Sequence, residues 1–350
     1  MYNLSVIIPI KITSKTMYIL NRLKSLIKFF DNFNIEVVIS DATVIDQYKN
    51  IIKEYIKNFD KIVYINKPIK GIYSASICRN NGVEFSTSDY LLFFDVDLVP
   101  NNQLIKQFFI DIKNIEENKF KFLIYPCLYL SKYYTDFLAT RSNLFDEEYF
   151  HIANKSFQEG NNIDVLYNAI NTSTILVSRE LFINIGMFDN SFSGHGYEDF
   201  ELIHRLFIFE NQQTIGKDYF TDYKTPLISE YRGFRKYFLI KTLPMYLSGI
   251  FTMHLYHSRP LNLMYYKNRI KNFEYFMMKI KENINYAELN ETEHIQLNEM
   301  PKNIKGFYEV ISHVDKKNNY KKKLRKLARS PLLFFIDFIK NKLRKIKTIM

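Results

Sequence analysis

Two aspartates separated by one residue end an apolar run early in the chain. The stretch LLFFDVDLVP places four apolar residues before Asp95 and Asp97, and a proline follows at position 100. Burying a carboxylate is costly unless a cation pairs with it. A divalent ion is one such partner, because hard cations prefer carboxylate oxygen and accept phosphate oxygen beside it. The alternative is a solvated turn in which the aspartates cap backbone N–H groups; the apolar run favours the ion.

A second acidic pair follows a glycine-rich loop in the stretch FSGHGYEDFELIHRL. Glu198 and Asp199 are predicted to open a helix shortly after Gly194 and Gly196. The positive end of a helix dipole stabilises anions at this place, and a carboxylate held there can remove a proton from a hydroxyl group. The competing interpretation is ordinary capping by acids in the first helical turn.

Two further stretches carry residues that are suited to binding charge. TMHLYHSRP holds His254 and His257 at a spacing that lets both imidazoles reach one ion, and imidazole binds Mn, Zn or Fe better than Mg. SASICRNNGV places Arg79 on a helix that leads into the aspartate strand, where its guanidinium can pair with a diphosphate. Taken alone, such a pair is more often two unrelated surface or core histidines, but the aspartate cluster, which needs a partner, shifts the weighting towards an ion. The alternative for Arg79 is an arginine on the helix surface.

The elements that must position these residues alternate along the first part of the chain. Four apolar runs predict strands: residues 4–10, 35–40, 61–65 and 90–97. Helical spacing of apolar residues predicts the helices between them: 17–30, 45–58 and 74–85. This alternation is typical of an α/β fold with a parallel sheet. Because ligands bind at the carboxyl ends of such strands, we expect Asp41, Asp95 and Asp97 to gather at one edge.

The rest of the chain continues with weaker patterns. Further helices are predicted at 101–118, 179–185, 199–210 and 262–284, and further strands at 122–126 and 172–178. Residues 131–170 are polar, aromatic and irregular, which indicates a loop-rich region. Residues 285–315 are only weakly patterned.

Composition bounds the class of protein. The chain has 350 residues, of which 47% are hydrophobic, so it is globular rather than disordered. Its two cysteines, Cys78 and Cys127, imply no disulfide framework and fit a reducing compartment. The N-terminus enters an apolar strand directly, so no signal peptide is expected. No run of about 18 uncharged apolar residues predicts a membrane span.

The positive charge is concentrated in the C-terminal tail. The whole chain carries +11, whereas residues 316–350 hold thirteen lysines and arginines and one acid, Asp337, a net of +12. Residues 1–315 therefore carry a net charge of −1. A basic tail on a neutral body favours binding to an anionic membrane surface over binding to nucleic acid. The alternatives are a helix packed on the domain's own surface and a coiled-coil-like surface for a partner.

Taken in order, the motifs resemble those of the GT-A glycosyltransferases, which use nucleotide sugars. The motifs are SVIIPIK, CRNNGV, FFDVDLVP, GMFDNSFSGHGYEDFELIHRL and HLYHSRP, over roughly residues 4–260. The closest branch comprises the β-1,4-galactosyltransferases and bacterial chondroitin-polymerase-type and capsule transferases. The resemblance implies a Rossmann-like, mostly parallel central sheet flanked by helices, with a C-terminal helical extension. We expect a catalytic domain over 1–275, a helical or irregular extension over 276–315 and a basic tail over 316–350.

The resemblance also implies roles for individual residues. Asp97 matches the acid of Asp-x-Asp that binds the metal, and His254 and His257 match a Met-x-x-His pair that adds two ligands to Mn2+ (or Mg2+). Asp199 matches the catalytic base, and Glu198 matches a contact to the donor sugar or the acceptor. The positions expected to bind the nucleotide sugar are Pro9, Lys11, Asp41, Arg79, Asp95 and Gly196. Two positions depart from the family pattern, since His254 replaces a methionine and His195 replaces a tryptophan.

The expected activity is therefore an inverting transfer of a hexose or N-acetylhexosamine of the Gal, GalNAc or Glc type from a UDP-sugar. The expected acceptor is a glycan or lipid-linked glycan of a bacterial surface polysaccharide, such as capsule, lipooligosaccharide or O-antigen, contacted by residues 131–170. Three alternatives remain: a retaining transferase of the GalNAc type, a nucleotidyltransferase, and a non-catalytic carbohydrate-binding or scaffold protein on the same fold. We expect a cytoplasmic protein that is peripheral on the inner face of the cytoplasmic membrane, without a nucleic-acid partner.

Overall fold

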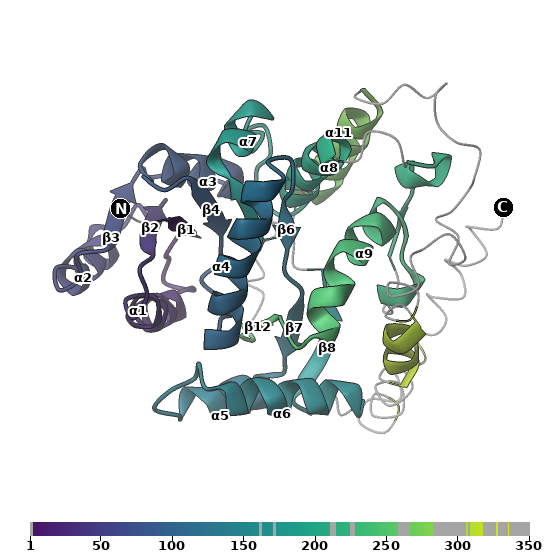
Figure 1. The fold of residues 1–350 in the computed structure, drawn as a ribbon. Coiled ribbons are helices and arrows are strands. Elements are labelled where there is room, and N and C mark those ends of the chain that lie inside the picture. The colour runs from purple at the N-terminus through teal and green to yellow at the C-terminus, as the bar shows by residue number, and fades with distance from the viewer. Residues whose placement is uncertain are drawn as a thin grey trace.

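The central element of the computed structural model is a six-stranded sheet with the order β3-β2-β1-β4-β9-β6 (Figure 1). The structure describes residues 3–160, 163–170, 173–210, 215–224, 228–257, 267–282, 306, 309–317, 327 and 335. The strands of this sheet are β1 (Leu4–Ile10), β2 (Glu36–Asp41), β3 (Ile62–Asn66), β4 (Tyr90–Phe93), β6 (Leu123–Ile124) and β9 (Ile175–Ser178). The first four run parallel, and β9 is antiparallel to both β4 and β6. The mostly parallel sheet expected from the sequence is confirmed.

Helices connect these strands and cover the sheet. They are α1 (Tyr18–Phe30), α2 (Asp46–Ile56), α3 (Ala75–Glu84), α4 (Asn102–Glu117) and α7 (Arg179–Asn184). The sheet is buried on both faces, because Val6 and Ile8 of β1 face one hydrophobic core and Ile7 faces another. A parallel strand buried on both faces has a continuous apolar sequence, which is why the short apolar runs predicted these strands well.

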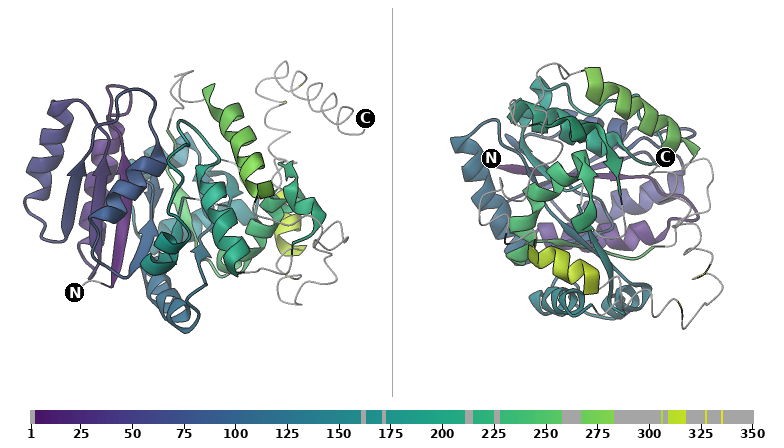
Figure 2. Two further views of the ribbon diagram at one scale, coloured as in Figure 1. Left: turned by 90° about the horizontal axis from the view of Figure 1, so that it is seen from above. Right: turned by 90° about the vertical axis from the view of Figure 1, so that its right-hand side faces the viewer.

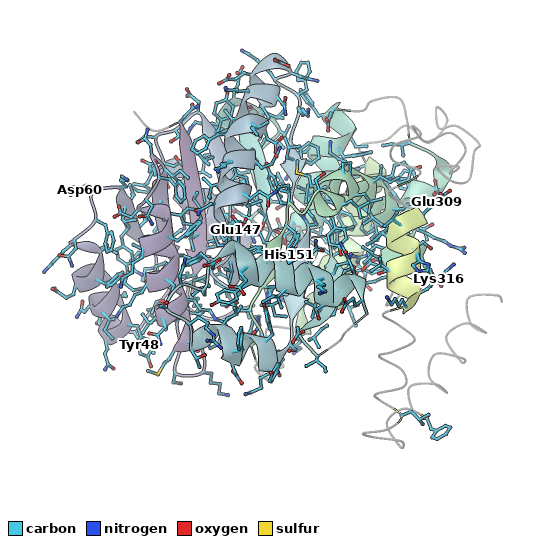
Figure 3. All side chains as sticks on the ribbon, turned by 60° about the horizontal axis from the view of Figure 1, so that its bottom comes forward. Tyr48, Asp60, Glu147, His151, Glu309 and Lys316 are labelled. Carbon is cyan, nitrogen blue, oxygen red and sulfur yellow. The ribbon has the colours of Figure 1, made fainter. Side chains whose placement is uncertain are left out.

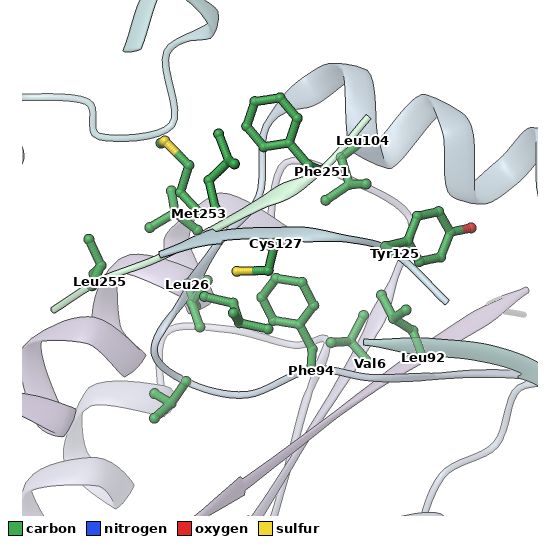
Figure 4. Packing of buried hydrophobic residues seen from close by; sticks show 14 of the residues in the cluster. Val6, Leu26, Leu92, Phe94, Leu104, Tyr125, Cys127, Phe251, Met253 and Leu255 are labelled. Atoms are coloured by element: carbon green, nitrogen blue, oxygen red, sulfur yellow. The ribbon is translucent and has the colours of Figure 1, made fainter. Parts of the chain in front are cut away.

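A second sheet of four strands, in the order β5-β12-β7-β8, packs against the first. Its strands are β5 (Leu98–Val99), β7 (Cys127–Leu130), β8 (Val165–Ala169) and β12 (Thr252–His254). Figure 4 shows Val6 and Leu92 of the first sheet in one buried cluster with Cys127 and Met253 of the second. Strand β12 is antiparallel to β5 and parallel to β7. This pairing fixes the segment with the histidines beside the segment that follows the aspartates.

Residues 131–170 are not the loop-rich region that the sequence pattern indicated. They include α5 (Lys132–Ala139), α6 (Glu147–Gln158) and β8, and both helices lie along the bottom of Figure 1. The side chains of Ser131 and Asp146 cap the two helices. The buried hydrophobic side chains of these two helices are Tyr134, Leu138, Phe150, Ala153 and Phe157. Helical spacing was present, but tyrosines and polar residues interrupt the apolar pattern.

The remaining described elements follow β9. They are α8 (Glu198–Glu210), a 3-10 turn at Lys217–Phe220, β10 (Asp222–Tyr223), a 3-10 turn at Ile228–Glu230, β11 (Arg232–Gly233), α9 (Phe234–Leu247) and α11 (Arg269–Glu282). Helices α8 and α11 contact each other and lie side by side in Figure 1. Helix α11 runs across the expected domain boundary at residue 275, and the boundaries themselves stay a prediction. Residues 309–317 are also helical, as Figure 2 shows in yellow.

The basic tail lies outside the described residues, apart from positions 316, 317, 327 and 335. Most of the weakly patterned stretch 285–315 and both ends of the helix predicted at 262–284 lie outside them as well. Within the described residues, no helix combines the length and the apolar character needed to cross a membrane. Both cysteines are buried and free.

Candidate active site

A cleft of about 1180 Å³ lies where the carboxyl ends of β1 and β4 meet the second sheet. The predicted site residues that line it are Pro9, Lys11, Arg79, Asp95, Asp97, Gly196, Glu198, Asp199, His254 and His257. His195, the residue that departs from the family's tryptophan, also lines the cleft. Segments far apart in the sequence therefore converge on one place.

Asp41 is the one predicted site residue that does not line the cleft. It is 1% exposed at the end of β2, and its carboxylate accepts hydrogen bonds of 2.7 Å from the Tyr64 hydroxyl and from the backbone N–H of Thr43. Burial raises the pKa of Asp41, and these two bonds act in the opposite direction. Asp41 thus links β2 to β3 and to the loop that follows β2. That Asp41 contacts a nucleotide remains a prediction.

The Asp-x-Asp stretch forms a turn rather than the end of a strand. The strand expected over 90–97 ends at Phe93, and the N–H of Leu98 donates to the carbonyl of Asp95 at 3.1 Å. The two aspartates face different partners, because Asp95 accepts from Arg79 at 3.0 Å and Asp97 pairs with Arg22 of α1. Each carboxylate is therefore compensated by an arginine.

Arg79 is brought into the cleft by the close packing of α3 on the sheet. The side chain of Ser74 caps α3 by accepting from the N–H of Ile77. At Gly82 a Cβ atom would lie 2.5 Å from Cγ2 of Ile7, so this approach requires glycine. The guanidinium of Arg79, only 2% exposed, donates to Asp199 at 2.6 Å as well as to Asp95. One arginine thus links the two acidic stretches.

The loop before α8 is held in a tight conformation. Gly196 has φ 96° and Tyr197 has φ 76°, a region that favours glycine. Asn272 of α11 donates 3.1 Å hydrogen bonds to the carbonyls of Ser193 and Gly196, and the Tyr197 hydroxyl donates to Asp222 at 2.8 Å. These contacts fix the place where α8 begins and so aim Glu198 and Asp199 into the cleft.

Glu198 is a buried acid with a raised pKa. It is 8% exposed, and its Oε2 atom has no hydrogen-bond partner among the described residues. Burial and the nearby charge of Asp199 raise the pKa of Glu198 to about 8, whereas the charge of Arg79 lowers it. The raised pKa favours the protonated form of this carboxyl group, which can donate a hydrogen bond to a substrate oxygen.

Asp97, His254 and His257 form a potential metal-binding cluster. One ligand atom from each lies within 4.8 Å of the others, and Oδ2 of Asp97 is 3.6 Å from Nε2 of His257. The N–H of Leu255 donates to the backbone carbonyl of Asp97 at 2.9 Å, which ties the histidine segment to the turn. Burial lowers the pKa of His254 to about 4, so its imidazole is neutral, as metal binding requires. One carboxylate and two imidazoles suit Mn2+ better than Mg2+.

Tyrosine rings hold both imidazoles in place. Tyr129 of β7 stacks on His254 with ring centroids 4.3 Å apart and planes 16° apart, and Tyr18 of α1 stacks on His257 at 5.8 Å and 15°. Tyr18, Arg22 and Tyr129 were not among the site residues predicted from the sequence. Each lies inside a regular helix or strand without a local motif, and only the tertiary structure brings it to the cluster.

Comparison with known proteins identifies the family. The family model described as "Glycosyltransferase like family 2" matches residues 5–282, so the chain belongs to this family. The protein is thus a glycosyltransferase with the GT-A fold, as the motif order implied. No curated protein matches the chain.

Several solved structures are similar to the chain. A mannosyltransferase, PcManGT from Pyrobaculum calidifontis in complex with GDP-Man and Mn2+, matches with 10% identity and a TM-score of 0.44, over 98% of this chain and 80% of that one. S. aureus TarS 1-349 matches with 16% identity and a TM-score of 0.35, over 59% of this chain and 55% of that one. GalNAc-T7 with UDP, GalNAc and Mn2+ matches with 14% identity and a TM-score of 0.37, over 59% and 40%.

Proposed function

We propose that the protein is a metal-dependent inverting transferase that moves a hexose or N-acetylhexosamine from a UDP-sugar to a hydroxyl group of a glycan. The observation that carries this proposal is the joining of two groups of residues in one cleft. The potential metal ligands Asp97, His254 and His257 line it together with the acidic pair, Glu198 and Asp199. A glycosyl transfer needs both, since a base must take a proton while the charge of the departing diphosphate is balanced.

In this mechanism Asp199 is the general base. The acceptor oxygen forms a bond to the anomeric carbon, the bond from that carbon to the diphosphate oxygen breaks, and the acceptor proton passes to the Asp199 carboxylate. Arg79 holds this carboxylate in position through a hydrogen bond of 2.6 Å. Both substrates lie in one cleft, and orienting them lowers the barrier further.

Other residues of the cleft serve the donor in this proposal. Asp97, His254 and His257 would hold the ion, which, when bound, supplies Lewis-acid stabilisation to the leaving diphosphate. Glu198, whose raised pKa favours its protonated form, donates a hydrogen bond to a sugar oxygen. Lys11 donates to the carbonyls of Ile69 and Gly71 at 2.7 and 2.9 Å and so positions one wall of the cleft.

The acceptor and the location of the enzyme belong to the same proposal. We place the enzyme at the inner face of the cytoplasmic membrane, where it extends a glycan or lipid-linked glycan of a bacterial surface polysaccharide. The support is the net +12 charge of residues 316–350, which attracts anionic lipid headgroups. Salt-sensitive cosedimentation of the full chain with anionic vesicles, but not with neutral ones, is the expected result. Equal binding of the protein to anionic and neutral vesicles would contradict a location at the membrane surface.

The proposed reaction is tested by incubating the protein with a panel of UDP-sugars and glycan acceptors. The expected result is a product from one donor whose anomeric configuration, read by NMR, is opposite to that of the donor. A product with the donor's configuration would instead establish the retaining alternative. Donor turnover without any glycoside product, across all acceptors offered, would contradict transfer to glycans.

A further inference from the structure

Arg22 of α1 contacts both chain segments that supply the proposed metal ligands. Its guanidinium pairs with Oδ1 of Asp97 and donates a 2.6 Å hydrogen bond to the carbonyl of Tyr256, which lies between the two histidines in sequence. Its Cζ atom lies 4.5 Å from the centre of the Tyr18 ring, which stacks on His257. The Arg22 side chain is 13% exposed, so its charge is only partly hydrated.

The cluster itself offers little uncompensated negative charge to a cation. Asp97 is the single carboxylate of the three-residue cluster, and Arg22 already balances it. Asp95 and Asp199 share the single charge of Arg79 and keep one net negative charge between them, but neither belongs to the cluster. A divalent ion held by Asp97 would therefore lie close to a fixed guanidinium in a partly dehydrated cleft. Repulsion between like charges is strong where water screens them poorly.

From this arrangement we infer that Arg22 makes metal binding depend on the nucleotide. Without a nucleotide, the guanidinium weakens ion binding at Asp97 and the two histidines. A nucleoside diphosphate supplies the missing negative charge, offsets both cations and so allows the ion to bind tightly. By linkage, the ion strengthens nucleotide binding by the same factor. This inference rests on the proposed function, because it concerns the metal and nucleotide site of that reaction.

The experiment measures the affinity of the full-length protein for Mn2+ by electron paramagnetic resonance, with and without saturating UDP. In the wild-type protein, UDP is expected to lower the Kd for Mn2+ by a factor within the range of about 5–150 found for coupled sites. Arg22→Met is expected to bind Mn2+ at least about fivefold more tightly than wild type without UDP, and to show a smaller effect of UDP. Arg22→Lys keeps the charge and should retain weak binding without UDP.

A matched control is Arg141→Met. Arg141 is exposed and lies 4.1 Å over the Phe137 ring, so the substitution removes the same charge from an aromatic contact away from the cluster. Arg22→Gln serves as a second neutral variant, and thermal melting confirms that each variant is folded. If the folded neutral variants bind Mn2+ without UDP as weakly as wild type, or more weakly, the inference is overturned.

If the proposed function itself is wrong, the Mn2+ titration gives a different result. In that case wild-type protein would not bind Mn2+ even with UDP present, or Asp97→Asn would bind it as tightly as wild type. The inference alone fails when wild type shows the coupling and Arg22→Met shows it undiminished.

Discussion

Arg79 and Asp199 are joined by a hydrogen bond of 2.6 Å, although 120 positions separate them in the chain. The same guanidinium donates to Asp95 at 3.0 Å. This link connects the helix of the CRNNGV motif, the Asp-x-Asp turn and the first turn of α8. Because the Arg79 side chain is buried, the arrangement of the proposed base depends on it directly.

Removing the Arg79 charge is expected to damage both stability and activity. Arg79→Met leaves two carboxylates without their buried partner, so we expect a loss of about 3–5 kcal/mol in the free energy of unfolding. Urea unfolding measures this loss, and UDP release measures activity. Arg79→Lys keeps the charge but cannot bridge both carboxylates with a fixed fork. Its stability and activity should therefore lie between those of wild type and those of Arg79→Met. A fully stable and active Arg79→Met protein would refute the role of this link.

Asp199→Asn is expected to lower kcat by about 10²–10⁴-fold, because an amide cannot accept the acceptor proton. Binding of Mn2+ and UDP should be retained, because Asp199 is not a proposed ligand. The matched control is Asp136→Asn, since the Asp136 side chain is 61% exposed on α5. Steady-state kinetics on the three proteins provide the measurement. An unchanged kcat in Asp199→Asn would exclude Asp199 as the general base.

Glu198 is expected to make the protein less stable as the pH rises from 4.5 towards 8. Its pKa is raised from 4.5 to about 8, first by burial and then by Asp199. Between these values the folded protein keeps a proton that the unfolded chain has released. The stabilisation is full below pH 4.5 and is lost through pH 8, with a slope of at most about 1.4 kcal/mol per pH unit.

Glu198→Gln tests this dependence, because glutamine resembles the protonated acid. Urea unfolding at about pH 5.5 and about pH 7.5 should show a smaller loss of stability in the variant than in wild type. Parallel pH dependences in the two proteins would show that Glu198 is not protonated in the folded state.

His254→Ala is expected to weaken Mn2+ binding in the presence of UDP. Loss of a direct ligand should cost more than the about 10–100-fold that is typical of losing an outer partner. His254 also affects the pH dependence of the free energy of unfolding. Burial lowers its pKa to about 4, so its neutral form stabilises the fold above about pH 6.5, and this contribution is lost as the pH falls towards 4. The matched control is His151→Ala, an exposed histidine of α6 that Figure 3 labels. Equal Mn2+ affinity in both variants would exclude His254 as a ligand.

The alternation of strands and helices was predictable because the β1 to β4 strands are parallel and mostly buried. Their sequences are short apolar runs, and the polar residues at their ends mark the edge where ligands bind. The acid pair that opens α8 was predictable for a similar local reason, since the glycines of a tight loop, Gly194 and Gly196, precede it. The family match of residues 5–282 agrees with the resemblance drawn from these motifs.

Features that depend on tertiary contacts were not predictable in this way. Arg22 occupies an ordinary polar position on α1, and nothing near it in sequence indicates that it pairs with Asp97. Tyr129 is one tyrosine among 26 in the chain, so its stacking on His254 has no distinctive sequence signal. Asp41 ends a strand as expected, but Tyr64 and Thr43 engage its carboxylate away from the cleft.

The most direct test of the account is the affinity for UDP, measured by calorimetry with and without Mn2+, in wild type and Asp97→Asn. Mn2+ is expected to tighten UDP binding to wild type by a factor within about 5–150, and Asp97→Asn is expected to lose this effect. UDP binding that is absent, or that is equally tight with and without Mn2+ in wild type, would contradict a metal-dependent nucleotide-sugar site in this cleft.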